Sequence, residues 1–357
     1  AALGTIVRRI FFKVAAGCVL IYILMDVCFD LKGLTGGGGS KTMLRSFPIV
    51  DKIPEAAAKR QTSTLTKIEN HGITGVPADV LSDSTMGNLS AWKLCPPIPP
   101  NLVGYIPTKM DVPSLDAVEG EFADVMAGGR FRPKECTSRH RVAILIPYRN
   151  RREQLNIFIY NIHRVLARQQ IDYGIFVIEQ GDSKDFNRAK LLNVGFMESI
   201  ALYDYECFVF HDIDLVPVDD RNVYTCPQRP RHMSVRIDSR SGAPYALMFG
   251  GVSALSKDLM LRVNGYSNLY WGWGGEDDDI SLRLKHINQT ILRRPKEIAR
   301  YKSLSHGKSK ANPARFGLIN QWEQRYKTDG LNSLKYRIMD VAFKKLYTWI
   351  LVDLREP

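Results

Sequence analysis

The chain has 357 residues, of which 45% are hydrophobic and 24% are charged, and its formal net charge is +12. This length can bury a substantial core, and we expect one folded domain of about 260 residues behind an N-terminal segment and a linker. The basic residues are scattered and form no zinc-finger, RNP or helix-turn-helix pattern, so the charge indicates solubility and attraction of small anions, with no nucleic-acid partner.

Residues 10–30 are predicted to anchor the chain in a membrane, because the stretch is apolar except near its ends and just long enough to span a bilayer. Lys13 and Asp26 lie within a turn of those ends and can extend to the interface. The basic residues before the stretch place residues 1–9 in the cytoplasm, which is the type II topology. A cleaved signal peptide is the alternative, because residues 14–25 have the length of its apolar region, although no small-residue cleavage site follows.

Residues 31–94 are predicted to be a flexible stem. They begin with a Gly-rich run at 36–40 and continue without helical or strand periodicity. Asn88 lies in an N-glycosylation pattern within this stem. A proline-rich run at 96–100 then marks the entry to the folded domain, which we expect over residues 95–357.

Four cysteines lie beyond the membrane segment, and an even number in a lumenal domain favours disulfides over buried free thiols. Four cysteines permit three pairings, and the residues alone do not choose among them. The four are Cys95, Cys136, Cys207 and Cys226.

Apolar strand-like runs alternate with helical ones in the first half of the domain. Strands are predicted at 141–147, 174–179 and 206–211, with helices at 153–169 and 187–201 between them. This order predicts an α/β fold with a mostly parallel, doubly wound central sheet. No Gly-x-Gly-x-x-Gly or P-loop pattern is present, so a dinucleotide or ATP site is not expected.

The third predicted strand ends at Asp212 and Asp214. Two residues apart on an extended chain, the carboxylates are expected on one face. Ligands gather at the carboxyl ends of strands in open α/β sheets, and oxygen ligands there suit Mg²⁺ and Mn²⁺, which share their shell with phosphates. The motif predicts a metal that holds a nucleotide diphosphate, and a solvated turn is the alternative.

The run WGWGGEDDD at residues 271–279 combines hinge glycines, two tryptophans and four carboxylates. Glycines allow a loop to move, tryptophan faces stack on sugar rings, and a carboxylate can take a proton from a hydroxyl. This combination predicts a carbohydrate site with a mobile lid. The alternative is an acidic first turn of a helix, because residues 276–279 precede a helical pattern.

Taken together, these motifs resemble the β-1,4-galactosyltransferase family of Golgi enzymes over roughly residues 95–357. The resemblance implies the GT-A fold, a Golgi membrane location with the catalytic domain in the lumen, and disulfides that join Cys95 with Cys136 and Cys207 with Cys226. The further matching segments are IPYRNR at 146–151, FNRAKLLNVG at 186–195, PRH at 230–232, FGGVSALSK at 249–257 and DGLNSL at 329–334.

By the same resemblance, one set of residues binds the UDP part of a UDP-sugar donor. The arginines would hold the diphosphate and uridine, which suits the fixed fork of a guanidinium. The set is Pro147, Arg149, Arg151, Phe186, Arg188, Asp212 and Trp273.

The resemblance also implies a divalent ion, Mn²⁺ or Mg²⁺, held by Asp214 and His306. The family usually has a methionine three residues before this histidine, where this chain has Ser303. A hydroxyl is harder than a thioether, so this difference should favour Mn²⁺ or Mg²⁺ over softer ions, or leave a water at that position.

Asp277 matches the family's catalytic base, with Glu276 and Asp278 as orienting neighbours and Trp273 on the loop that closes over the substrates. The acceptor would be a GlcNAc-terminated glycan on protein or lipid, and a modifier subunit that redirects specificity is conceivable. The expected acceptor contacts are Tyr245, Arg315 and Phe316.

Met248 and Gly251 are expected to border the donor sugar. Relatives with tyrosine at the position of Met248 use galactose, and those with a smaller aliphatic residue accept N-acetylgalactosamine. Methionine is slim and flexible, so UDP-GalNAc is the expected donor and UDP-Gal the alternative. A non-catalytic sugar-binding relative is the alternative from another class, and the presence of Asp214, His306 and Asp277 argues against it.

Overall fold

The computed structural model describes residues 93–307 and 309–354. The predicted cytoplasmic tail, membrane anchor and nearly all of the stem, including Asn88, lie outside the described residues. Within the described part, none of the helices combines the length and the hydrophobicity needed to cross a bilayer.

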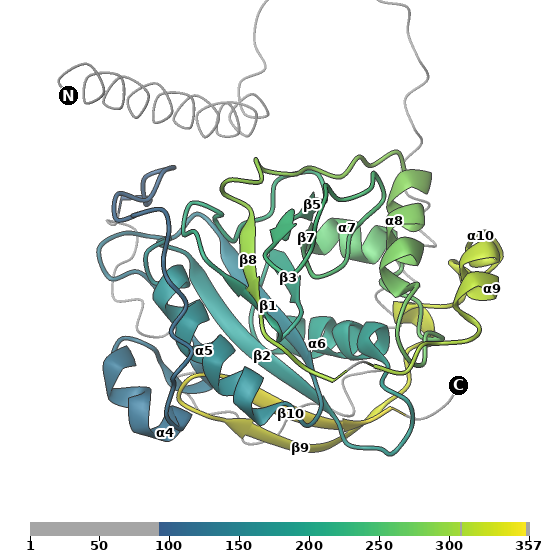
Figure 1. The fold of residues 1–357 in the computed structure, drawn as a ribbon, viewed down its shortest axis with the longest axis horizontal. Helices are drawn as coiled ribbons and strands as arrows, with labels where there is room; N and C mark the ends of the chain where they lie inside the picture. The colour runs from purple at the N-terminus through teal and green to yellow at the C-terminus, as the bar shows by residue number, and fades with distance from the viewer. Residues whose placement is uncertain (1–92, 308, 355–357) are drawn as a thin grey trace, which may run out of the picture. The chain divides into compact units, whose positions relative to one another are not determined.

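A seven-stranded sheet forms the centre of the domain, in the order β5-β7-β3-β1-β2-β10-β9 (Figure 1). β1 pairs in parallel with β2 and with β3, and β10 pairs in parallel with β2, whereas β7, β5 and β9 are antiparallel to their neighbours. The strands are β1 Arg141–Tyr148, β2 Asp172–Gln180, β3 Cys207–His211, β5 Arg231–His232, β7 Val252–Ser256, β9 Arg337–Phe343 and β10 Thr348–Asp353.

The prediction of a mostly parallel sheet is therefore wrong outside the four central strands, and the sheet is mixed. β9 and β10 are consecutive strands joined by a few residues, and such a short connection can join only antiparallel strands. The sequence pattern that led to the prediction covers β1, β2 and β3 alone, and those three are parallel as expected.

Helices cover both faces of the central sheet, as predicted. α5 (Arg152–Leu166) and α6 (Arg188–Leu202) follow β1 and β2, within three residues of the predicted bounds. The side chains of β1 alternate between two hydrophobic clusters: Ile144 packs in the cluster that includes α5, and Leu145 in the cluster that includes α6. Because successive side chains of a strand point to opposite faces, the sheet packs against α5 on one face and α6 on the other, as the middle of three layers.

A smaller sheet lies beside the carboxyl end of β3. It consists of β4 (Leu215–Pro217), β8 (Arg300–Ser303) and β6 (Arg236–Ile237), in the order β4-β8-β6. β8 is antiparallel to β4, and the main-chain N of Leu304 donates to the main-chain O of Asp214 at 2.7 Å. The chain that continues from β8 therefore passes directly beside Asp214.

The remaining helices are short, apart from α8 (Glu276–His286), which packs in the hydrophobic cluster of α6 through Ile280 and Leu284. The others are α4 Leu115–Val118, α7 Lys257–Arg262, α9 Arg315–Asn320 and α10 Trp322–Arg325, with 3-10 turns at Glu119–Phe122, Ala127–Gly129 and Leu331–Ser333.

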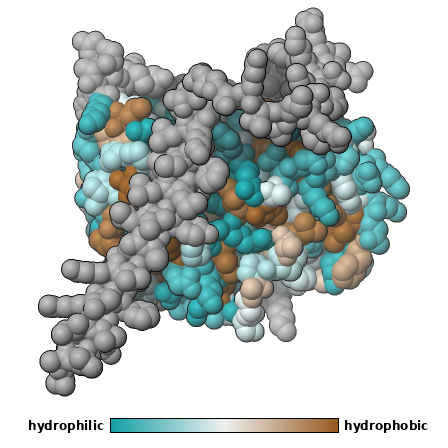
Figure 2. Space-filling view, turned by 90° about the horizontal axis from the view of Figure 1, so that it is seen from above, coloured by the Kyte–Doolittle hydropathy of each residue, from teal (hydrophilic) through white to brown (hydrophobic). Residues whose placement is uncertain are grey.

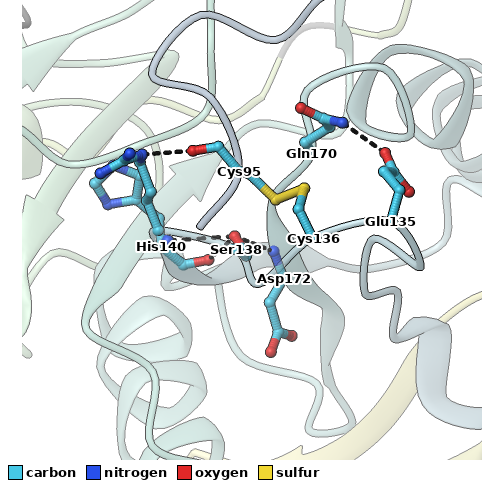
Figure 3. The surroundings of a disulfide bond; sticks show 8 residues. Cys95, Glu135, Cys136, Ser138, His140, Gln170 and Asp172 are labelled. Carbon is cyan, nitrogen blue, oxygen red and sulfur yellow. Dashed lines mark hydrogen bonds between the residues drawn. A yellow bond between two sulfur atoms is a disulfide. The ribbon is translucent and has the colours of Figure 1, made fainter. Parts of the chain in front are cut away.

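Residues 93–307 and 309–354 contain two disulfides, Cys95–Cys136 and Cys207–Cys226, in the pairing that the family resemblance implies. Figure 3 shows the first, which fastens the start of the folded domain to the segment before β1. The same segment is held to the β2 side by Ser138, whose Oγ accepts from the main-chain N of Asp172 at 3.0 Å. The disulfide thus secures the N-terminal border of the domain.

Candidate active site

Polar side chains converge at the carboxyl ends of β1 and β3. Arg149 and Arg151 directly follow β1, and Asp212 and Asp214 follow β3. Pro147 lies within β1, near its end. Neighbouring parallel strands end at the same edge of a sheet, which brings these residues together where the sequence predicted a nucleotide site.

Asp212 and Asp214 lie in a turn and not on an extended strand. β3 ends at His211, and the main-chain N of Leu215 donates to the main-chain O of Asp212 at 3.2 Å. The expectation that an extended chain places both carboxylates on one face is therefore wrong in its premise. The pKa of Asp214 is nevertheless raised, first by burial and second by the charge of Asp212, so the two carboxylates act on each other across this turn.

Asp214 lies against His306, whose Nε2 is 2.5 Å from the Oδ2 of Asp214. The guanidinium of Arg151 contacts both, with Nη1 at 3.5 Å from the same carboxylate oxygen and Nη2 at 3.2 Å from the His306 Nδ1. Ser303 is the last residue of β8, three residues before His306, and its main-chain N donates to Asp238.

This pair fits a divalent cation that completes its shell with substrate oxygens. Carboxylate oxygen and imidazole nitrogen are ligands that Mn²⁺ accepts, and such ions commonly share their coordination with phosphates. Among residues 93–307 and 309–354, no group of three or more His, Cys, Asp or Glu side chains could hold a metal. Asp214 and His306 therefore supply two positions, and a diphosphate would have to supply others.

Arg188 links the turn after β3 to the start of α8. Its Nε donates to the Oδ1 of Asp212 at 2.5 Å, and its Nη1 lies 3.6 Å from the Oε1 of Glu276. Burial, and next the charge of Asp277, raise the pKa of Glu276 to about 7. The arginine thus holds acidic groups from two distant segments in one site.

The expected uridine side is formed by Arg149 and Phe186. The guanidinium of Arg149 lies 5.3 Å from the centre of the Phe186 ring, and its Nη1 donates to the main-chain O of Lys184 at 2.6 Å. The main-chain N of Gly272 donates to the main-chain O of Phe186 at 2.9 Å. The tryptophan loop therefore adjoins this side of the site.

The four carboxylates at 276–279 form the first turn of α8, as the helix-start interpretation predicted. Asp277 faces Gly250, and Asp278 accepts from the Tyr245 hydroxyl at 2.6 Å. Asp279 is fully buried and pairs with the Nε of Arg283 at 2.6 Å. Of the four carboxylates, Asp279 therefore pairs inside the core. Glu276, Asp277 and Asp278 contact the segments that surround the candidate site.

The tryptophan loop is docked on the segment that follows β8. The main-chain N of Trp273 donates to Lys310 at 2.8 Å, and the main-chain O of Trp273 accepts from Asn312 at 3.0 Å. The Trp273 ring is 60% exposed and the Phe316 ring 65% exposed, and the Arg315 guanidinium lies between them, 6.0 Å and 4.5 Å from the ring centres. These exposed rings are available to a sugar.

Tyr245 is also exposed, so three aromatic rings at the site meet solvent. Figure 2 shows one face of the molecule, on which hydrophobic residues form separate patches among hydrophilic ones. Exposed aromatic rings such as those of Tyr245, Trp273 and Phe316 suit sugar rings, which present both apolar faces and hydroxyls.

Met248 and Gly251 lie on the segment between Tyr245 and β7. Gly251 has a φ of 79°, and a side chain there would collide with the Oγ of Ser234. The structure adds two residues that the sequence interpretation did not assign to the site, Arg293 and His232, which contact main-chain oxygens of this segment. His232 belongs to a motif used only for the resemblance, and Arg293 has no recognisable pattern around it.

Two family models match adjacent parts of the chain. One, described as the N-terminal region of glycosyl transferase group 7, matches residues 95–227, and the other, described as the N-terminal domain of galactosyltransferase, matches residues 231–307. The chain is 43% identical to beta-1,4-galactosyltransferase 1 of Mus musculus over 350 residues, which are 94% of this chain and 87% of the mouse protein. It is 46% identical to the Homo sapiens protein of the same name over 288 residues, 79% of this chain and 72% of the human protein.

Solved structures that match this chain include enzymes with the same kind of name. The catalytic domain of Drosophila beta1,4galactosyltransferase 7 in complex with xylobiose matches with a TM-score of 0.55 and 28% identity, covering 61% of this chain and 95% of that chain. A mutant of the Drosophila enzyme, in complex with manganese, UDP-Gal and xylobiose, matches with a TM-score of 0.53 and the same identity.

Proposed function

Because the chain belongs to the β-1,4-galactosyltransferase family, we propose that it is an inverting, Mn²⁺-dependent enzyme that moves a sugar from a UDP-sugar to the 4-hydroxyl of a terminal GlcNAc. The family membership makes it a β-1,4-glycosyltransferase with a GT-A-like fold and a mixed sheet. The donor sugar, the acceptor and the residue roles are our proposal.

One observation supports the proposal most strongly, namely the position of Arg188 between Asp212 and Glu276. It joins the donor side of the site, where Asp214 and His306 meet, to the carboxylates at the start of α8. A donor diphosphate beside Asp214 and His306 and an acceptor hydroxyl beside the carboxylates of α8 would then lie on opposite sides of one sugar. Transfer requires this arrangement.

In the proposed reaction, Asp277 accepts the proton of the acceptor 4-hydroxyl while that oxygen forms a bond to the anomeric carbon. The bond from the anomeric carbon to the diphosphate breaks on the opposite face, UDP leaves with the bonding electron pair, and an α-linked sugar becomes β-linked. Burial, and next the charge of Asp278, raise the pKa of Asp277, which strengthens it as a base. Arg188 opposes this shift and helps to keep the group ionised.

Asp214 and His306 are the residues that would hold the metal, with Ser303 or a water nearby. A bound Mn²⁺ or Mg²⁺ neutralises charge on a departing diphosphate. Arg149 and Arg151 would bind the donor beside it, and closure of the Trp273 loop would exclude water that could hydrolyse the donor.

UDP-GalNAc is the donor that Met248 favours. Its side chain is half-buried on the segment before β7 and leaves more room than a tyrosine for a substituent at C2 of the sugar. A pocket change of this size shifts selectivity by about 1–3 kcal/mol. We expect the enzyme to prefer UDP-GalNAc over UDP-Gal and the Met248→Tyr variant to reverse the preference.

UDP-Gal is the second candidate donor, since the relatives are named galactosyltransferases and the Drosophila enzyme was solved with UDP-Gal. Comparing the kcat/KM of both donors with a GlcNAc acceptor and Mn²⁺ decides between them. Preference of the unmodified enzyme for UDP-Gal would overturn the role given to Met248. We further propose a lumenal Golgi location with residues 10–30 as the membrane anchor.

A further inference from the structure

Arg293 contacts the segment that carries Tyr245 and Met248. Its Nη2 donates to the main-chain oxygens of Tyr245 at 3.1 Å, Ala246 at 3.0 Å and Met248 at 2.8 Å. Its Nε donates to the Nδ1 of His232 at 3.2 Å. A guanidinium is suited to this task because it presents its N–H groups in a rigid plane. One side chain therefore gathers three carbonyl groups of a surface segment.

His232 connects Arg293 to Gly250 through two hydrogen bonds, one at each ring nitrogen. The imidazole is fully buried, and because its Nδ1 accepts from Arg293, its Nε2 carries the proton and donates to the main-chain O of Gly250 at 3.1 Å. The hydroxyl of Ser234 donates to the same oxygen at 3.2 Å. The Gly250 carbonyl is thus fixed from two directions.

Gly250 and Tyr245 both touch the carboxylates of the site. An ideal Cβ on Gly250 would lie 2.1 Å from the Oδ2 of Asp277, so that carboxylate rests on the glycine backbone. Tyr245 donates its hydroxyl to Asp278 at 2.6 Å. A shift of the segment from 245 to 250 would therefore displace both Met248, which we propose borders the donor sugar, and the proposed base.

Arg293 is itself held in place by the strand that carries His232. The main-chain N of His232 donates to the main-chain O of Leu292 at 2.9 Å, and the main-chain N of Leu292 donates to Pro230 at 2.8 Å. The backbone of Leu292, next to Arg293, is thereby held beside β5, which anchors the point from which the guanidinium extends.

We propose that Arg293 is a positioning residue that sets donor-sugar selectivity, acting through the carbonyl groups of residues 245–248 and through His232. This inference rests on the proposed role of Met248 in donor selection. Arg293 touches neither the metal pair nor the uridine side, so its effect is confined to the sugar-binding half of the site.

The test compares the unmodified 357-residue chain with Arg293→Met, which keeps an unbranched apolar stem but has no side-chain N–H donors, and with Arg293→Lys. For Arg293→Met we expect the ratio of kcat/KM for the two donors to move toward unity by about tenfold and the KM for the GlcNAc acceptor to rise. The Kd for UDP stays unchanged, because Arg149 and Phe186 are untouched. Arg293→Lys retains one donor group, so we expect its donor ratio and its acceptor KM to lie between those of the unmodified chain and of Arg293→Met.

Hydrogen exchange of the peptide covering residues 245–251 provides a readout that needs no transfer. We expect faster exchange in Arg293→Met while the rest of the domain is unchanged. If the unmodified protein transfers neither sugar, the proposed function fails, and the exchange still tests the support by Arg293. An unchanged donor ratio with unchanged exchange overturns the inference, as does an equal loss of UDP binding and of every kinetic parameter in both variants.

Discussion

The Oδ2 atom of Asp277 lies directly over the backbone of Gly250, with no room for a methyl group between them. The two residues come from different elements, the start of α8 and the segment before β7. This contact sets the position of the carboxylate that we assign as the base, and it explains why a glycine occupies position 250 although its φ is not in the left-handed region.

Replacing Gly250 with Ala should lower kcat by about 100-fold, because displacing a catalytic group by about 1 Å costs that much. The Kd for UDP should not change, since the uridine side is remote from the new methyl group. Gly120→Ala is the matched control, because nothing lies within 4 Å of a Cβ there. A Gly250→Ala enzyme that folds and keeps its kcat would show that Asp277 is not held as described.

Asp277→Asn and Asp279→Asn should fail in different ways, although the residues share one helical turn. Asp277→Asn removes the base and should lower kcat by about 10²–10⁴-fold with little loss of stability. Asp279→Asn breaks a buried ion pair with Arg283 and should lower the free energy of unfolding by about 3–5 kcal/mol. Denaturation curves and initial rates of both variants check this, and an active Asp277→Asn enzyme refutes the assignment of the base.

Loss of the metal should abolish transfer. EDTA should stop the reaction and Mn²⁺ should restore it. His306→Gln should raise the half-saturating Mn²⁺ concentration by at least the roughly 10–100-fold that loss of an outer-shell partner causes. Gln154→Ala is the control, because Gln154 donates to the main-chain O of Ser305 at 2.9 Å and so secures the same loop without a ligand role. Equal effects of both changes would point to loop order and not to metal binding.

Acid should destabilise the domain through His163. Burial lowers the pKa of His163 to about 4, below the usual histidine value of 6.5. Between pH 6.5 and 4 the unfolded chain binds a proton that the folded chain does not, so the free energy of unfolding falls as pH decreases, by up to about 1.4 kcal/mol per pH unit.

The structure offers a conservative variant for this test. The Nδ1 of His163 accepts from the Tyr173 hydroxyl and its Nε2 donates to the main-chain O of Leu346, both at 2.8 Å. His163→Gln can make similar hydrogen bonds without titrating. Urea denaturation at pH 7, 6 and 5 should show a weaker pH dependence for the variant, and an identical dependence would exclude His163 as the cause.

The sequence predicted the three parallel strands and their helices because these elements are long and strongly patterned. β9 was not predicted, since its side chains alternate poorly between exposed and half-buried at the edge of the sheet. The prediction of a mostly parallel sheet therefore did not include the antiparallel strand β9 at the edge.

The candidate site could be outlined from the sequence only as far as its motifs extend. The four carboxylates at 276–279 carry the same charge, and only the helical turn of about 100° per residue decides that Asp279 points to Arg283 and Asp277 to Gly250. Arg293 acts through main-chain carbonyl groups, which leave no trace in the sequence of the segment they belong to.

Product analysis tests the central claim most directly. The 357-residue chain is incubated with Mn²⁺, a β-linked GlcNAc acceptor and either UDP-GalNAc or UDP-Gal, and the product is examined by NMR. We predict a new β-1,4-linked sugar that is absent with EDTA and nearly absent with Asp277→Asn. Transfer from neither donor, an α linkage, or full activity without metal would contradict the account.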